Sequence, residues 1–210
     1  MGLLDETIAI RSAVARSVSV PLHLVNTLLL LAALTLTAFW ASGGGPIRPG
    51  TDRSFAVWAA VIAAGTVLVS ATGAVTALAD TLFPKDAVGF AVGDLAGSEH
   101  LLTRLRTIHP IVATALGLGV VLMARRRWSA ANSTSRVARL LVALVVLQLA
   151  AGLANVLLFT PVWIQLVHLL LADAIWVAFV WFAAAGLQGA SGGPGQPNSD
   201  RRAVGSETGA

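Results

Sequence analysis

Residues 138–186, ARLLVALVVLQLAAGLANVLLFTPVWIQLVHLLLADAIWVAFVWFAAAG, decide the fold of this chain. They contain two apolar runs, 138–159 and 162–186, separated only by Thr160 and Pro161. An α-helix rises about 1.5 Å per residue, so each run can cross a hydrocarbon layer about 30 Å thick. Threonine favours the N-cap of a helix and proline its first turn. The pattern therefore predicts a tight antiparallel hairpin of two membrane-spanning helices.

Three earlier apolar runs, 20–41, 55–79 and 107–124, have the same length and character. The 210 residues are 56% hydrophobic and 11% charged, which is too little charge to cover a soluble domain and predicts a lipid bilayer around the chain. The net charge of +4 does not indicate nucleic acid, because the arginines lie beside apolar runs. The predicted fold class is all-α, a polytopic membrane bundle of about five transmembrane helices: a four-helix bundle and one extra helix.

The chain divides into an N-terminal arm over 1–19, a transmembrane domain over 20–187 and a disordered tail over 188–210. The loop over 80–106 is expected to hold a short interfacial helix. Five arginines and no acid lie between the third and fourth runs: Arg125, Arg126, Arg127, Arg136 and Arg139. Loops rich in arginine stay in the cytoplasm, which predicts an outer N-terminus and a cytoplasmic C-terminus for this multi-pass protein of the bacterial inner membrane.

Three of the four histidines lie in or at the mouth of helices that all run from outside to inside: His23, His109 and His168. Counted from the cytoplasmic ends of their helices, they lie at similar depth, about 24 to 27 Å above the inner surface. A haem iron takes one imidazole on each face, so two ligands must agree in height within a few ångströms. The alternative is that each histidine is an ordinary hydrogen-bonded residue near the membrane interface.

Polar residues around these histidines have two interpretations each. Arg104 and Arg106 precede His109 and suit the propionates of a haem, or they mark the water interface. Asp173 lies deep within the last run, where a carboxylate needs a partner. Counting from the turn at Thr160 predicts that Asp173 meets Gln148, and that Asn155 meets Gln165, as contacts that lock the hairpin.

At this point the sequence resembles the haem A synthase family (COX15/CtaA) over about residues 20–187. The segments that carry the resemblance are PLHLVNTLLLLAALTLTAFWASGG (21–44), ATGAVTALADTLFP (71–84), HLLTRLRTIHPIVA (100–113) and LQLAAGLANVLLFTPVWIQLVHLLLADAIW (147–176). Members of that family have eight spans in two four-helix bundles, each with a pair of haem-ligating histidines. They oxidise the C8 methyl of haem O to the formyl of haem A for cytochrome oxidase.

The resemblance implies that this chain corresponds to the last five spans. His109 and His168 then resemble the pair that holds haem b in the C-terminal bundle. His23 resembles the second histidine of the N-terminal bundle, which is the bundle that handles the substrate. The resemblance therefore makes His23 a possible ligand of a second haem iron. The first histidine of that bundle, with a glutamate three residues before it, has no counterpart, because no E-x-x-H occurs here. A truncated gene, a second copy or a separate chain would explain this absence.

Three functions remain open from the sequence. The first is an oxidoreductase of the haem A synthase type, with haem O and haem A as substrate and product, inactive as an isolated chain. The second is a bis-histidine b-type cytochrome that only transfers electrons. The third is a haem-free assembly subunit of the membrane.

Overall fold

The computed structural model describes residues 3–50, 52–82, 101–128, 133–159 and 161–188, with side chains for 15–77 (51 excepted), 108–128, 134–159 and 161–188. These residues form five α-helices: α1 (Leu3–Ala41), α2 (Arg53–Leu82), α4 (Leu101–Arg125), α5 (Ser133–Leu157) and α6 (Val162–Leu187). All five are long and apolar enough to cross a membrane, over 15–41, 53–77, 108–125, 134–157 and 162–187. The predicted all-α membrane fold is therefore confirmed.

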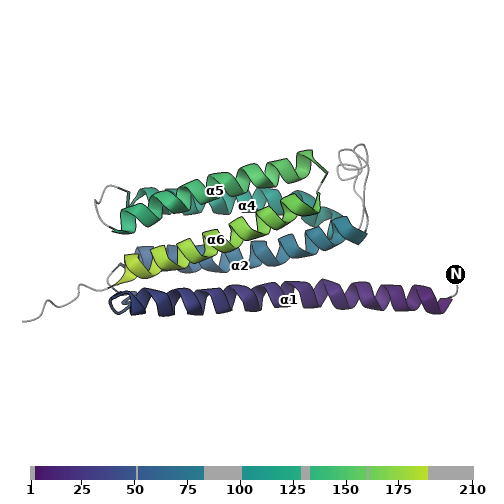
Figure 1. Cartoon of the computed structure of the whole chain (residues 1–210), viewed down its shortest axis with the longest axis horizontal. Helices are drawn as coiled ribbons and strands as arrows, with labels where there is room; N and C mark the ends of the chain where they lie inside the picture. The colour runs from purple at the N-terminus through teal and green to yellow at the C-terminus, as the bar shows by residue number, and fades with distance from the viewer. Residues whose placement is uncertain (1–2, 51, 83–100, 129–132, 160, 189–210) are drawn as a thin grey trace, which may run out of the picture.

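Four of the helices form a ring in the order α2, α4, α5, α6 (Figure 1). Each packs against its two neighbours in the ring, whereas α4 and α6 lie diagonally opposite and do not pack on each other. Helix α1 lies outside the ring, against α2 and α6. The buried indole of Trp176 on α6 fixes this contact by donating a hydrogen bond of 2.7 Å to the carbonyl of Leu28 on α1.

The fully buried core occupies only one half of the ring. Its members come from the start of α2, the end of α4, the start of α5 and the end of α6, with one from α1: Leu28, Phe55, Ala59, Ile62, Val120, Met123, Ala124, Ala138, Leu141, Val145, Trp176, Ala178, Phe179 and Phe182. We call this half, which contains residues 42–50 and 126–128, the arginine end. The opposite half, which contains the α5–α6 turn, is the histidine end.

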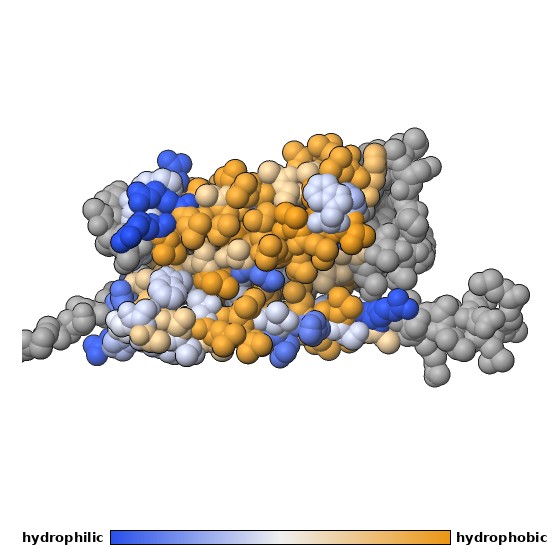
Figure 2. Space-filling model, in the orientation of Figure 1, coloured by the Kyte–Doolittle hydropathy of each residue, from blue (hydrophilic) through white to orange (hydrophobic). Residues whose placement is uncertain are grey.

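The outer surface is apolar, as a membrane protein requires. Figure 2 shows a hydrophobic face over the middle of α5 and α6, with hydrophilic residues at the arginine end and further ones along α1. Large aliphatic side chains on this surface are more than half exposed, for example Leu68 at 64%, Ile111 at 65% and Leu170 at 68%. In water such exposure would cost free energy, so these side chains face lipid.

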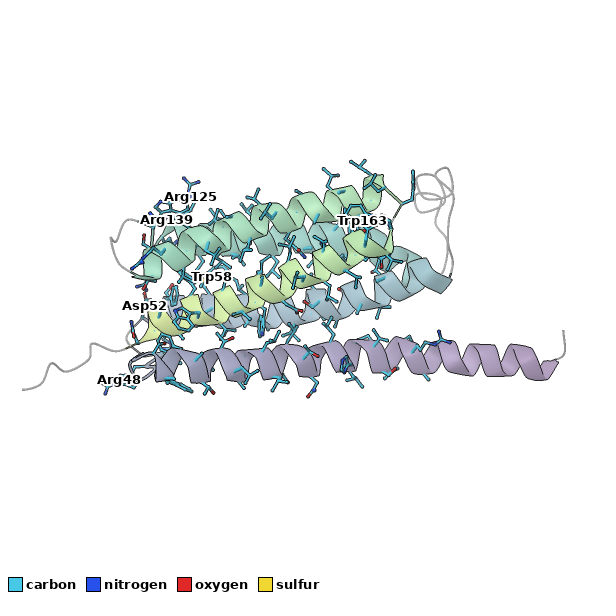
Figure 3. The ribbon with its side chains drawn as sticks, viewed as in Figure 1. Arg48, Asp52, Trp58, Arg125, Arg139 and Trp163 are labelled. Carbon is cyan, nitrogen blue, oxygen red and sulfur yellow. The ribbon has the colours of Figure 1, made fainter. Side chains whose placement is uncertain are left out.

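Specific polar contacts tie the arginine end together (Figure 3). Asp52 caps α2 by accepting a hydrogen bond of 3.0 Å from the amide of Phe55, and its second oxygen lies 2.8 Å from Arg127. The guanidinium of Arg127 also covers the ring of Phe55, at 4.6 Å from the ring centroid. The amide of Arg48 donates to the carbonyl of Leu187 at 2.8 Å, which joins the α1–α2 connection to the end of α6.

Three details differ from the sequence-based expectation or lie beyond it. The arm over 1–19 continues into the first span without a break, because α1 begins at Leu3. Pro161 is the N-cap residue of α6 and provides no side-chain cap, so the prediction of a first-turn proline is wrong. Thr160, the middle of the 80–106 loop and the tail from residue 189 lie outside the described residues.

Candidate functional site

His109 and His168 lie on the two diagonal helices of the ring, α4 and α6. Both imidazoles are partly buried. Both are at the histidine end, where Ile164 is the one fully buried side chain among the described residues of α2, α4, α5 and α6. The two histidines therefore share the half of the ring in which almost no described side chain is fully buried.

The ring of His109 packs against a glycine of the neighbouring helix α2. A Cβ atom at Gly73 would lie 2.7 Å from Cε1 of His109, closer than real Cβ contacts allow. The next residue toward the N-terminus, Thr72, places its hydroxyl oxygen 3.5 Å from Nδ1 of His109. That hydroxyl donates its proton to the carbonyl of Val69 at 2.9 Å, so its oxygen faces the imidazole as an acceptor.

His168 has a matching environment on helix α5. A Cβ atom at Gly152 would lie 3.2 Å from Cε1 of His168. The side-chain amide of Gln148, one turn earlier, lies 3.1 Å from Nε2 of His168. Two buried atoms here have no hydrogen-bond partner among the described residues, namely Nδ1 of His168 and Oε1 of Gln148. An unsatisfied ring nitrogen in a membrane span is costly, which marks it as a candidate ligand atom.

Each histidine thus has one ring nitrogen in contact with a polar side chain of the adjacent helix, Thr72 for His109 and Gln148 for His168. At His109 the engaged nitrogen is Nδ1, and an acceptor there favours the tautomer that leaves Nε2 with its lone pair. At His168 the engaged nitrogen is Nε2 and Nδ1 is free. Metal-ligating histidines are held in this way, by a hydrogen bond to the nitrogen that does not bind the metal.

The arrangement suits a haem iron better than a free metal ion. Among the described side chains no group of three or more His, Cys, Asp or Glu residues gathers that could hold a metal ion. A haem supplies four ligands from its porphyrin and needs only two from the protein, one on each face. His109 and His168, on diagonal helices of the ring, are the residues that could supply those two ligands.

The structure does not bring His23 together with the other two histidines. His23 is exposed, on the face of α1 opposite the buried residues Leu28, Thr35 and Phe39. Asn26 and Thr37 are exposed on the same outward side. Figure 2 shows hydrophilic patches among the apolar residues along α1. A role for His23 as an iron ligand stays a prediction.

The other polar predictions have mixed outcomes. Arg104 and Arg106 lie in the first turns of α4, but their side chains are outside the described ones, so propionate binding stays a prediction.

The predicted pair of Asp173 and Gln148 is wrong, since Gln148 contacts His168 and Oδ1 of Asp173 is buried without a partner among the described residues. Asp173 follows His168 by five residues, which turns its side chain about 140° away around the helix. The pairing of Asn155 with Gln165 stays a prediction.

The sequence analysis missed three residues of this site: Thr72, Gly73 and Gly152. A usable signal was present, because glycine in the interior of a helix costs stability and implies a close approach by another group. Gly152 precedes His168 by the distance that an antiparallel hairpin around residue 160 would bring into contact.

Comparison with known proteins identifies the family of this chain. The family described as cytochrome oxidase assembly protein, COX15-CtaA, matches residues 2–180. Two curated relatives, both named protoheme IX farnesyltransferase, come from two strains of Thermus thermophilus and are 45% and 44% identical over 178 residues. Each alignment covers 82% of this chain but 29% of the relative, so the chain spans less than a third of their length. No solved structure matches.

Proposed function

The chain belongs to the COX15/CtaA family of cytochrome oxidase assembly proteins, and we propose that its four-helix ring binds one haem b between His109 and His168. The observation that carries the proposal is the pair of imidazoles on diagonal helices, each packed on a glycine and held at one nitrogen. Arg104 and Arg106, on the turns before His109, are the candidate partners for the propionates. Haem b is the cofactor that this pair of residues would hold.

The protein's own residues would perform three tasks in this site. His109 and His168 would bind and orient the haem, with their free ring nitrogens as ligands of the iron. Thr72 and Gln148 keep the imidazole planes from rotating by holding the other nitrogens. The lipid-facing aliphatic residues exclude water from the ring. When bound, the haem supplies a one-electron couple that can be oxidised and reduced within the membrane.

The reaction that we propose for the complete system is the oxidation of the C8 methyl of haem O to the formyl of haem A, for cytochrome oxidase. The supporting arguments are family membership and the curated relatives, whose printed name concerns the modification of a haem. A second site would lie on the outward face of α1, where His23 is the candidate residue. A second copy or a separate chain would cover that face, because polar side chains do not face lipid without cost.

The orientation that we propose places the arginine end in the cytoplasm of a bacterial cell, at its inner membrane. The positive-inside rule supports this, since Arg125, Arg126 and Arg127 lie together at that end. The N-terminus of α1 would then lie outside and the tail after α6 inside. Cysteine labelling of this cysteine-free chain from either side of the membrane tests the orientation.

A reduced-minus-oxidised spectrum of the purified protein tests haem binding. We expect the bands of a low-spin bis-histidine haem b, and their loss in His109→Ala and in His168→Ala. Exposed His23→Ala is the matched control and should retain them, because His23 lies outside the ring. A wild-type protein without a haem band would leave the haem-free assembly subunit as the function.

A second candidate function is a cytochrome that only transfers electrons. The observation that favours it is that His109 and His168 both lie within the ring, on diagonal helices, whereas His23 is exposed on α1, outside the ring. A haem O conversion assay separates the two functions, with the chain alone and with a full-length homologue. We expect no turnover by the chain alone, because the chain contains no E-x-x-H. Haem A formation by the isolated chain would contradict this expectation.

A further inference from the structure

The two histidines are held by partners of different chemistry. The hydroxyl hydrogen of Thr72 is committed to the carbonyl of Val69, so Thr72 can only accept from His109. The amide of Gln148 carries both a donor and an acceptor, and only one of them can face His168 at a time. The oxygen of that amide, Oε1 of Gln148, is buried without a hydrogen-bond partner among the described residues.

This difference has a consequence once an iron occupies the ring. A neutral imidazole that ligates iron through one nitrogen carries its proton on the other. The nitrogen of His168 that faces α5 then becomes a donor and needs an acceptor. A half-turn of the Gln148 amide supplies its oxygen to that proton, and no existing hydrogen bond of this oxygen is lost.

We propose that Gln148 is a positioning residue of the haem site that sets the reduction potential through His168. This inference rests on the proposed haem at His109 and His168. An acceptor on the outer nitrogen makes the imidazole a more basic ligand, which favours ferric over ferrous iron and lowers the potential. Thr72 has the same effect through His109, but a smaller one, because its contact is 3.5 Å against 3.1 Å for Gln148.

Potentiometric titration of the haem-loaded full chain tests this proposal with substitutions of opposite sign. Gln148→Leu removes the acceptor and should raise the potential, with the ferric-to-ferrous ratio at a fixed potential falling about tenfold, or about 59 mV for one electron. Gln148→Glu offers a stronger acceptor and should lower the potential. A purely structural role would move both variants in the same direction.

Thr72→Val and Thr66→Val form a matched pair on helix α2. Thr72 contacts His109, whereas Thr66 donates only within its own helix, to the carbonyl of Ile62 at 2.8 Å. We expect Thr72→Val to raise the potential by less than Gln148→Leu does, and Thr66→Val to leave it unchanged. If Gln148→Leu does not fold, Gln148→Asn, whose shorter side chain cannot reach His168, should give the same rise.

The outcomes distinguish this inference from the function on which it rests. A wild-type chain without haem overturns both. Wild-type haem with equal potentials in Gln148→Leu and Gln148→Glu, or with shifts of the same sign, overturns the role of Gln148 alone. A shift in Thr66→Val as large as that in Thr72→Val also contradicts it.

Discussion

The arginine end and the histidine end of the ring differ in how completely their polar groups are satisfied. At the arginine end Asp52 has both a backbone donor and Arg127, and the core beneath it is fully buried. At the histidine end four buried atoms have no partner among the described residues: Oε1 of Gln148, Oδ1 of Asn155, Nδ1 of His168 and Oδ1 of Asp173. Figure 3 shows the labelled charged residues, Arg48, Asp52, Arg125 and Arg139, all at the arginine end.

This difference separates stability from function. A chain selected only for stability would fill the histidine end with apolar side chains and satisfy its polar atoms. Local violations of that rule are expected where a protein binds something. The arginine end therefore holds the helices in register, and the histidine end is where buried polar atoms lack partners among the described residues. Substitutions at the two ends should have different effects on unfolding and on haem content.

The largest effect on stability is expected from Asp173→Leu. A carboxylate within a membrane span costs about 2.5–3.5 kcal/mol on insertion scales, and the buried oxygen of Asp173 has no described partner to offset that cost. Thermal unfolding in detergent should show a stabilised variant with unchanged haem content. A destabilised variant would mean that Asp173 has a partner that holds α6 in place.

Next in size is Gly73→Ala, where the new Cβ atom would lie 2.7 Å from the ring of His109. Overpacking costs about 1–3 kcal/mol, and here it falls on a ligand, so haem retention should decrease about tenfold or more. Gly152→Ala, at 3.2 Å from His168, should reduce retention less. Haem content per chain, measured by pyridine haemochrome, checks both. Full retention in Gly73→Ala would contradict the packing of His109 on α2.

A smaller effect is expected at the arginine end from Asp52→Ala, which removes the N-cap of α2 and the partner of Arg127. Loss of such a cap costs about 0.5–2 kcal/mol. Asp52→Asn keeps an acceptor for the cap and should lose only the exposed ion pair, about 0.2–1 kcal/mol. Chemical unfolding measures both costs. Loss of haem from Asp52→Ala without unfolding would show that the two ends are not independent.

The smallest effect is expected from Gly119→Ala, the counterpart of Gly73→Ala on α4. No atom lies within 4 Å of the new Cβ, so the helix should gain about 0.5–1 kcal/mol because alanine has less backbone freedom to lose. Haem content should not change. A loss of haem equal to that in Gly73→Ala would mean that any glycine substitution disturbs the ring.

The sequence allows the position of a side chain along its helix to be predicted, but not the direction in which the side chain points around the helix. Apolar runs fixed the five spans to within a few residues. Counting along them gave three histidines similar predicted heights, and the family resemblance then singled out His109 and His168. The same counting placed Asp173 level with Gln148 and His23 level with the other histidines. Asp173 points about 140° away from His168, and His23 lies on the outward face of α1. Which face of a nearly uniformly apolar helix meets its neighbour depends on packing that such a sequence does not display.

Imidazole rescue tests the bis-histidine site most directly. His109→Gly and His168→Gly each leave a gap the size of one ligand ring, so each purified variant should lose the low-spin haem spectrum, and added imidazole should restore it. His23→Gly should keep the low-spin spectrum with or without imidazole. A low-spin haem that persists in both ring variants without imidazole would contradict ligation by His109 and His168.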